Sequence, residues 1–228
     1  FAGDRLRMYT RYAERQGYNV PKAHLWAVMG DSEFREGSLS EAMPDFAERQ
    51  LGNLTWILDF NRQSLDGHRI TNQKIMHGTD DLRVQRMMEA NGWHVVHARH
   101  GKKRAKLFSK EGGATFQAIF EGEWADYELQ VLLLLADGKL VRAMLLEKSK
   151  KLEKFLKGVN DTDLYDAVHD FGGHDFETLL EAYEETKRET NRPSMVIAHT
   201  IKGWGLKMAA NPGNHSAIPE EPELAELA

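Results

Sequence analysis

The strongest constraint on the fold comes from two short apolar runs that each end in polar residues. Residues 25–29 (LWAVM) end at Gly30, and residues 54–58 (LTWIL) are followed by the segment DFNRQ. Between them, residues 36–50 carry apolar side chains at helical spacing, although Pro44 should shorten or kink that helix. This order predicts a β-α-β unit whose two strands run parallel, with the helix packed across them.

The polar residues that follow these strands form a candidate ligand site. Asp31 and Asn61 should meet at the edge of the sheet where parallel strands place their carboxyl ends. A carboxylate and an amide oxygen suit Mg²⁺, which also binds diphosphate oxygens, and Gly30 allows close approach of the backbone. The residues indicate a Mg²⁺-bridged diphosphate. The alternative is a strand-ending turn followed by a loop asparagine that bonds its own backbone.

The rest of the chain extends the same architecture. Helices are predicted over residues 4–17, 80–91 and 176–190, strands over 93–97 and 194–199, and a long polar loop over 61–78. We therefore expect an α/β fold with a parallel sheet flanked by helices. Helical patterns also cover 125–136 and 140–157.

Some segments carry narrower expectations. In the helix at 176–190 the buried stripe should include Leu180, and Asp175 should cap its amino end. Residues 100–104 (HGKKR) are interpreted as a basic loop on the surface, and residues 219–228 as a tail that frays.

Composition excludes several classes of protein. The chain has 228 residues and no cysteine, and the missing cysteine excludes disulfides and thiolate metal sites. Its formal net charge of −5 disfavours a nucleic-acid partner, because phosphate contacts need a basic surface. Its longest wholly apolar run, residues 131–136, is too short to span a membrane. We expect a cytoplasmic location, with no membrane and no nucleic acid among the partners. Because the chain begins at Phe1, we also expect it to be a fragment of a longer chain.

Taken together, the motifs resemble those of a known family, the homodimeric type of pyruvate dehydrogenase E1 component. This family belongs to the transketolase-like superfamily of thiamine-diphosphate-dependent enzymes. The resemblance is carried by these segments: residues 30–33 (GDSE), 51–54 (LGNL), 61–67 (NRQSLDG), 92–93 (GW), 172–175 (GGHD) and, most specifically, 199–205 (HTIKGWG). It implies an incomplete thiamine-diphosphate-binding fold, a single domain over residues 1–228 in which 105–160 is a helical insertion and 205–228 a mobile loop and tail.

The resemblance also implies a cofactor site for thiamine diphosphate and Mg²⁺. The metal ligands would be Asp31, Asn61 and the backbone carbonyl of Gln63. The residues expected along the diphosphate are Gly30, Asp31, Ser32, Glu33, Asn61, Gln63 and Lys202. Ser32 departs from the glycine that the family usually has, and Glu33 has an alternative role as an acidic residue that opens a helix.

Three residues are candidates for catalysis. By resemblance, His199 and Lys202 lie near the active centre, and His215 is the best match to a loop histidine that handles the intermediate or the lipoyl group. Lys202 could also neutralise phosphate or carboxylate charge, and His199 could simply finish its strand. For His174, a place facing the cofactor and a structural loop role both remain open.

The activity implied is oxidative decarboxylation of a 2-oxoacid, most of all pyruvate, with acyl transfer to the lipoyl domain of an E2 acyltransferase. A pyrimidine-binding domain of the same or a partner chain would complete the site in a homodimer, so we expect this chain alone to be inactive. The alternatives are transketolase-like ketol transfer and a non-catalytic module, for which Ser32 is a hint. A flavodoxin-like phosphate-binding protein would leave the pairing of Asp31 with Asn61 unexplained.

Overall fold

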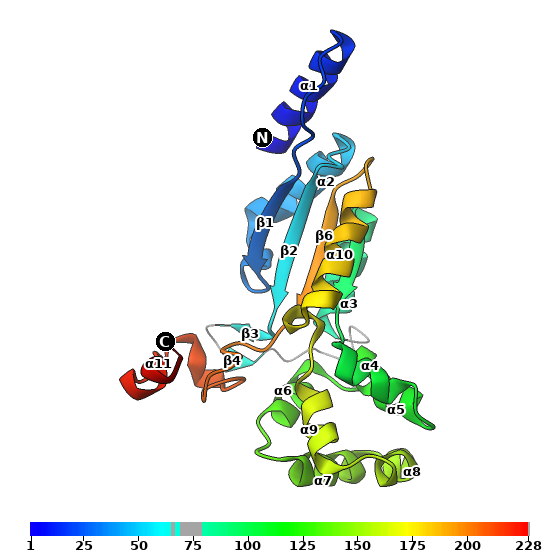
Figure 1. Cartoon of the computed structure of the whole chain (residues 1–228), viewed down its shortest axis with the longest axis vertical. Helices are drawn as coiled ribbons and strands as arrows, with labels where there is room; N and C mark the ends of the chain where they lie inside the picture. The colour runs from blue at the N-terminus through cyan, green and yellow to red at the C-terminus, as the bar shows by residue number, and fades with distance from the viewer. Residues whose placement is uncertain (65–66, 69–78, 228) are drawn as a thin grey trace.

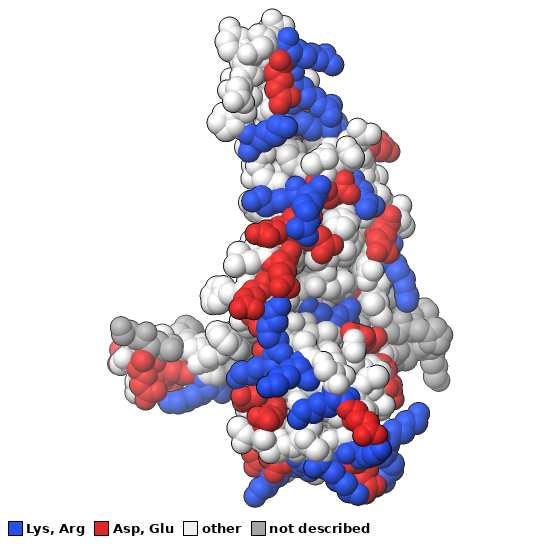
Figure 2. All heavy atoms as spheres, turned by 45° about the vertical axis from the view of Figure 1, so that its right-hand side comes forward, with Lys and Arg blue, Asp and Glu red and all other residues white. Residues whose placement is uncertain are grey.

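The computed structural model describes residues 1–64, 67–68 and 79–227. Helix α1 (Ala2–Arg15) lies at one end of an elongated molecule, a parallel sheet in the middle and a group of short helices at the other end (Figure 1). Within the described ranges, no helix combines the length and apolar character needed to cross a membrane. Figure 2 shows Lys and Arg interspersed with Asp and Glu over one face. Exposed ion pairs of the chain include Lys102–Glu181 and Lys103–Asp166.

The central sheet has four parallel strands in the order β1-β2-β6-β5. Their bounds are Leu25–Gly30 for β1, Leu54–Phe60 for β2, His94–Ala98 for β5 and Ser194–His199 for β6. The register pairs Gly30 with Asp59 and Phe60 with His199, so three strands end at one level. The predicted α/β fold with a parallel sheet is confirmed.

Helices cover the two faces of the sheet because side chains alternate along each strand. On one face, β2 and β6 bury Trp56, Leu58 and Ile197 against α2 (Gly37–Glu48) and α3 (Asp80–Ala90). On the other face, α10 (Phe176–Arg188) packs on β5 and β6, and Asp175 caps it as predicted by accepting from Thr178 N at 2.9 Å. Leu180 was wrongly assigned to the buried stripe, since it is 60 % exposed on the side of α10 away from the sheet.

The helical unit at the far end has its own core. It contains α4 (Lys102–Phe108), α5 (Gly113–Ala118), α6 (Asp126–Leu133), α7 (Gly138–Lys148), α8 (Glu153–Lys157) and α9 (Asp161–His169). Its status as an insertion over 105–160 remains a prediction.

The basic surface loop predicted at residues 100–104 is correct in that Lys102 and Lys103 are exposed, but wrong about the loop and about Arg104. Residues from Lys102 onward belong to α4, and the Arg104 side chain is fully buried. The reason is that its guanidinium donates hydrogen bonds to the carbonyl oxygens of Ala167 and Val168 at the carboxyl end of α9, at 2.8 and 2.7 Å. It also lies over the rings of Phe120 and Phe171.

The remaining elements are short. They are an antiparallel pair, β3 (Gln63–Ser64) and β4 (Gly67–His68), 3-10 turns at Glu33–Arg35, Lys150–Leu152, Gly172–His174 and Pro212–His215, a π turn at Ile119–Glu123, and α11 (Glu221–Leu227). Much of the polar loop predicted over 61–78 falls outside the described residues.

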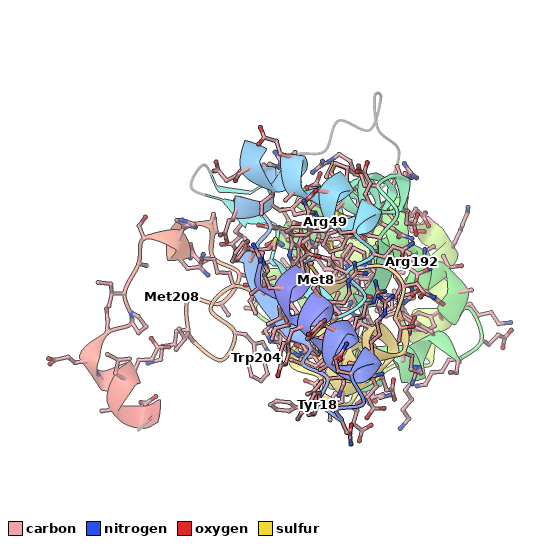
Figure 3. The ribbon with its side chains drawn as sticks, turned by 90° about the horizontal axis from the view of Figure 1, so that it is seen from above. Met8, Tyr18, Arg49, Arg192, Trp204 and Met208 are labelled. Carbon is pink, nitrogen blue, oxygen red and sulfur yellow. The ribbon has the colours of Figure 1, made fainter. Side chains whose placement is uncertain are left out.

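The carboxyl-terminal segment forms an arm. Seen from above, Trp204 lies near its base and Met208 farther out, to one side of α1 (Figure 3). Where the sequence predicts a fraying tail, the structure has α11, and Glu223 accepts a hydrogen bond from Lys207 N at 2.6 Å.

Candidate functional site

The predicted metal ligands come together at the carboxyl edge of the sheet. Arg62 N donates to Asp31 Oδ2 at 2.8 Å, and Gln63 N donates to Asn61 Oδ1 at 3.0 Å. Ser32 Oγ donates to the carbonyl oxygen of Gln63 at 3.4 Å. We call residues 61–63, which hold two of the three predicted ligands, the metal loop. The turn after β1 and this loop are therefore joined by direct hydrogen bonds.

The backbone of this region explains two local features. Ser32 has φ −78° and ψ −42°, an ordinary helical conformation, so serine fits where the resembled family usually has glycine. Glu33 accepts a hydrogen bond from Gly30 N at 3.1 Å, which ties the carboxylate to the turn. Arg62, in contrast, has φ +65°, a left-handed conformation that side chains disfavour.

The chemistry of the donor set fits Mg²⁺. The Asp31 carboxylate, the Asn61 amide oxygen and the Gln63 carbonyl are hard oxygen ligands, and all three residues are buried. Within the described residues, Gln63 Oε1 is also buried without a hydrogen-bond partner, while Gln63 Nε2 donates to Ala210 O at 3.0 Å. A bound ion or its water would supply a partner for this buried acceptor beside the three oxygen ligands.

His199 lies at the end of β6 and is fully buried. Its Nδ1 is 2.6 Å from Arg62 Nη2 and its Nε2 is 3.2 Å from His97 Nδ1. A guanidinium can only donate, so Nδ1 accepts and Nε2 carries the ring proton. Burial, followed by the charges of Arg99 and Arg62, holds the pKa of His199 well below its usual value. Both nitrogens of this neutral ring are hydrogen-bonded to protein side chains, and Nδ1 binds the side chain of Arg62 in the metal loop.

The other catalytic candidates lie farther along the same segment. The carbonyl of Lys202 accepts from Ala210 N at 3.0 Å and from Asn214 Nδ2 at 2.8 Å, and its side chain is partly exposed. His215 is exposed at the end of a 3-10 turn that contacts β3 and β4. Both lie on the segment that crosses next to the metal loop, and their catalytic roles remain predictions.

For His174 the contacts are structural. Its Nε2 accepts a hydrogen bond from Ile201 N at 2.8 Å, and its ring stacks on Trp204 at 4.6 Å. The preceding glycine is required for close packing, because a Cβ at Gly173 would lie 2.4 Å from the carbonyl oxygen of His199. The Gly172–His174 turn therefore fixes the path of the chain as it leaves β6.

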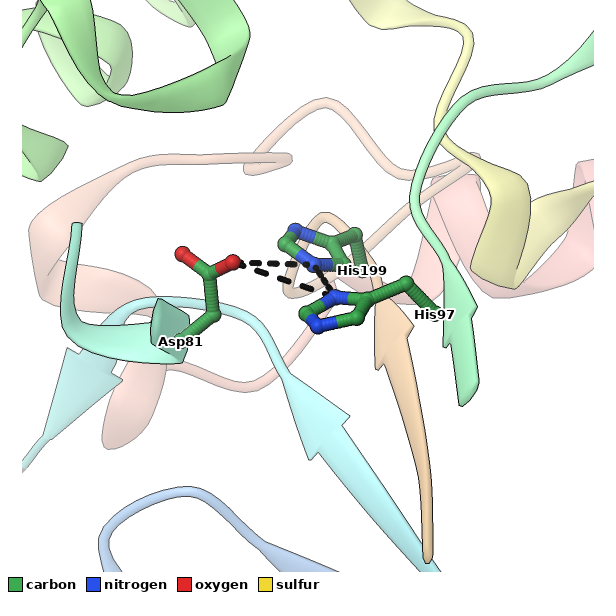
Figure 4. A group of neighbouring side chains, drawn as sticks. All are labelled: Asp81, His97 and His199. Atoms are coloured by element: carbon green, nitrogen blue, oxygen red, sulfur yellow. Dashed lines mark hydrogen bonds and ion pairs between the residues drawn. The ribbon is translucent and has the colours of Figure 1, made fainter. Parts of the chain in front are cut away.

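Figure 4 shows a cluster that sequence reasoning missed, formed by Asp81, His97 and His199. Asp81 Oδ2 lies 3.8 Å from His97 Nδ1 and 3.7 Å from His199 Nε2. Such spacing resembles a metal site, yet the Arg99 guanidinium already pairs with Asp81 and lies 3.2 Å from His97 Nδ1. Because His199 Nε2 also carries its proton, we interpret the cluster as a polar network around Arg99.

The missed residues had weak sequence signals. In the sequence, Asp81 falls at the start of the helix predicted at 80–91, and Arg62 falls between two predicted ligands, so neither has a pattern that indicates a site. His94 and His97 face opposite sides of β5. His94 Nε2 lies 3.4 Å from Glu185 Oε1 of α10, whereas His97 Nε2 lies 2.9 Å from Gln85 Oε1 of α3.

The chain is similar to several known proteins. Residues 4–111 match the family model described as transketolase, thiamine diphosphate binding domain. The pyruvate dehydrogenase E1 component of Corynebacterium glutamicum is 28 % identical over 200 residues, which are 87 % of this chain and 21 % of that protein. That of Escherichia coli K12 is 26 % identical over 208 residues, 90 % of this chain and 22 % of that protein. The chain thus spans about a fifth of the length of these curated relatives.

Solved structures show the same fold. A transketolase from Pichia stipitis superposes with a TM-score of 0.51 at 20 % identity, covering 99 % of this chain and 22 % of that one. The transketolase from Leishmania mexicana gives 0.52 at 16 % identity, over 91 % of this chain and 19 % of that one. The resemblance read from the motifs is confirmed: the chain is similar in sequence to the pyruvate dehydrogenase E1 components and to the thiamine diphosphate binding domain of transketolase, and it has a transketolase-like fold.

Proposed function

We propose that this chain supplies the Mg²⁺- and diphosphate-binding half of a thiamine-diphosphate-dependent 2-oxoacid dehydrogenase site, with pyruvate as substrate. The observation that carries the proposal is that the turn after β1 is tied to the loop that holds Asn61 and Gln63, since Asp31 accepts from Arg62 N and Ser32 donates to the carbonyl of Gln63. These residues would hold the ion, while the turn at Gly30, Ser32 and Glu33 would lie along the diphosphate.

The chain's own residues would bind and orient rather than carry the chemistry. Bound thiamine diphosphate would supply the nucleophilic carbon needed to cleave carbon dioxide from a 2-oxoacid. The Asp31 carboxylate would neutralise part of the charge on the ion, and the buried loop would keep water from the ligands. The partly exposed Lys202 would balance phosphate or carboxylate charge, and His215 would approach the acyl group or the lipoyl arm.

The sequence relatives favour dehydrogenase activity over ketol transfer. The similarity to E1 components extends over most of the chain, whereas the solved transketolases are at most 20 % identical and indicate the fold alone. We propose further that a pyrimidine-binding domain of the same or a partner chain completes the site in a homodimer, and that the lipoyl domain of an E2 acyltransferase accepts the product.

Calorimetric titration of thiamine diphosphate tests the proposal. We expect heat that requires Mg²⁺ and disappears with a chelator. Asp31→Asn, which keeps an acceptor for Arg62 N, should weaken the Mg²⁺-dependent binding by roughly 100-fold or more, because loss of outer-shell partners alone weakens metal binding 10–100-fold. Asp45→Asn on the exposed face of α2 is the matched control and should bind as the wild type does. Heat that does not depend on Mg²⁺ and Asp31 would contradict the proposal.

A further inference from the structure

The middle residue of the metal loop, Arg62, has an unusual combination of backbone and side-chain environments. Its N–H donates to Asp31 Oδ2, and its φ of +65° lies in the left-handed region. Only a few per cent of non-glycine residues adopt this conformation. Contacts of both the backbone and the side chain hold Arg62 in it.

The Arg62 side chain is held on several sides and is only 3 % exposed. Its Nε donates to Asp126 Oδ1 at 3.2 Å, and its Nη2 donates to His199 Nδ1 at 2.6 Å. The guanidinium also lies 4.9 and 5.0 Å from the ring centroids of Phe60 and Phe171. These contacts come from β2, from α6, from β6 and from the segment before the Gly172–His174 turn.

The two hydrogen-bond acceptors of Arg62 are themselves fixed. Asp126 Oδ2 accepts from Asp80 N at 2.8 Å, which ties α6 to the amino end of α3. His199 is held by the network around Asp81 and His97 described above. The loop is thus anchored through one guanidinium to a layer of hydrogen-bonded polar side chains between the sheet and the helical unit.

We propose that Arg62 is the positioning residue of the metal loop. Its buried guanidinium holds residues 61–63 in the path that brings Asn61 Oδ1 and the Gln63 carbonyl beside Asp31. The role of this position in ligand affinity rests on the proposed function, whereas its role in fixing the loop does not.

Hydrogen exchange of the ligand-free protein tests the positioning directly. In Arg62→Met, we expect the amides at positions 62 and 63 to exchange at least about 10-fold faster than in the wild type, after correction for global stability. The matched control is Arg104→Met, since Arg104 is equally buried and stacks on the same Phe171 ring but donates to α9 carbonyls. It should lose global stability without a local change at 62 and 63.

Arg62→Lys provides a second variant that keeps the charge beside Asp126 but lacks the second nitrogen that reaches His199. We expect it to give intermediate exchange. Equal local protection in the wild type, Arg62→Met and Arg62→Lys would overturn the proposal.

Calorimetry separates this proposal from the function of the site. Mg²⁺-dependent binding of thiamine diphosphate should weaken by about 10–100-fold in Arg62→Met and stay within about 3-fold in Arg104→Met. If the wild type shows no such binding, the proposed function fails, while the exchange data still decide whether Arg62 fixes the loop. Unchanged affinity in an Arg62→Met protein that binds the ligand overturns the role in affinity.

Discussion

The most informative single substitution for stability is Asp126→Asn. Asp126 is fully buried, and among the described residues its two oxygens accept from Arg62 Nε at 3.2 Å and from Asp80 N at 2.8 Å. Asparagine has nearly the same shape but only one acceptor oxygen, so its NH₂ group would face one of these donors. The substitution also removes the carboxylate that pairs directly with the buried Arg62 guanidinium, whose charge Asp81 and Asp31 stabilise less.

Two effects of opposite sign determine how much stability the Asp126→Asn substitution removes. Burial raises the pKa of the Asp126 carboxyl, whereas the charge of Arg62 lowers it, so removing the carboxylate relieves one desolvation penalty. The penalty on buried Arg62 remains, however, and breaking one side of a buried pair costs about 3–5 kcal/mol. At about 2–4 °C per kcal/mol for a chain of this size, we expect the melting temperature to fall by about 6–20 °C.

Scanning calorimetry and urea unfolding measure this loss. Asp137→Asn is the control, since Asp137 also accepts from two backbone donors, Lys139 N and Leu140 N, but is exposed at the start of α7. Asparagine is a good N-cap, so the control should change stability by less than about 0.5 kcal/mol. An Asp126→Asn protein within about 1 kcal/mol of the wild type would refute this account of the buried pair.

Three further predictions concern the same edge of the sheet. Burial lowers the pKa of His97 to about 4, so as the pH falls this histidine is protonated in the unfolded chain before it is protonated in the folded chain. The contribution of His97 to the free energy of unfolding should be fully present near pH 7 and should fall by about 2 kcal/mol by pH 5. Urea unfolding at the two pH values should show a smaller decrease in His97→Gln than in the wild type. Gly173→Ala should destabilise by about 1–3 kcal/mol, because its Cβ would lie 2.4 Å from the carbonyl oxygen of His199. Gly158→Ala, with its nearest atom at 3.5 Å, should change the melting temperature much less. Ser32→Gly should leave thiamine diphosphate affinity within about 3-fold, because Ser32 has an ordinary φ and its 3.4 Å hydrogen bond to the Gln63 carbonyl is long. A larger change in calorimetry would show that the hydroxyl contributes to binding.

The sequence alone determined the elements around the site. The strands ending at Gly30 and at Phe60, the helix between them and the strand ending at His199 are all encoded by local periodicity and by the residues that interrupt it. Because parallel strands end at one edge, the order of these elements was enough to bring Asp31 and Asn61 together.

Only the tertiary structure decided which charged residues are buried. A run such as residues 100–104 has the composition of a surface loop, and nothing within it reveals that Arg104 finds its partners at the end of α9. The same holds for Arg62, whose acceptors lie on α6 and β6. A charged side chain can be buried only where distant donors and acceptors converge on it, and that convergence depends on how the elements pack.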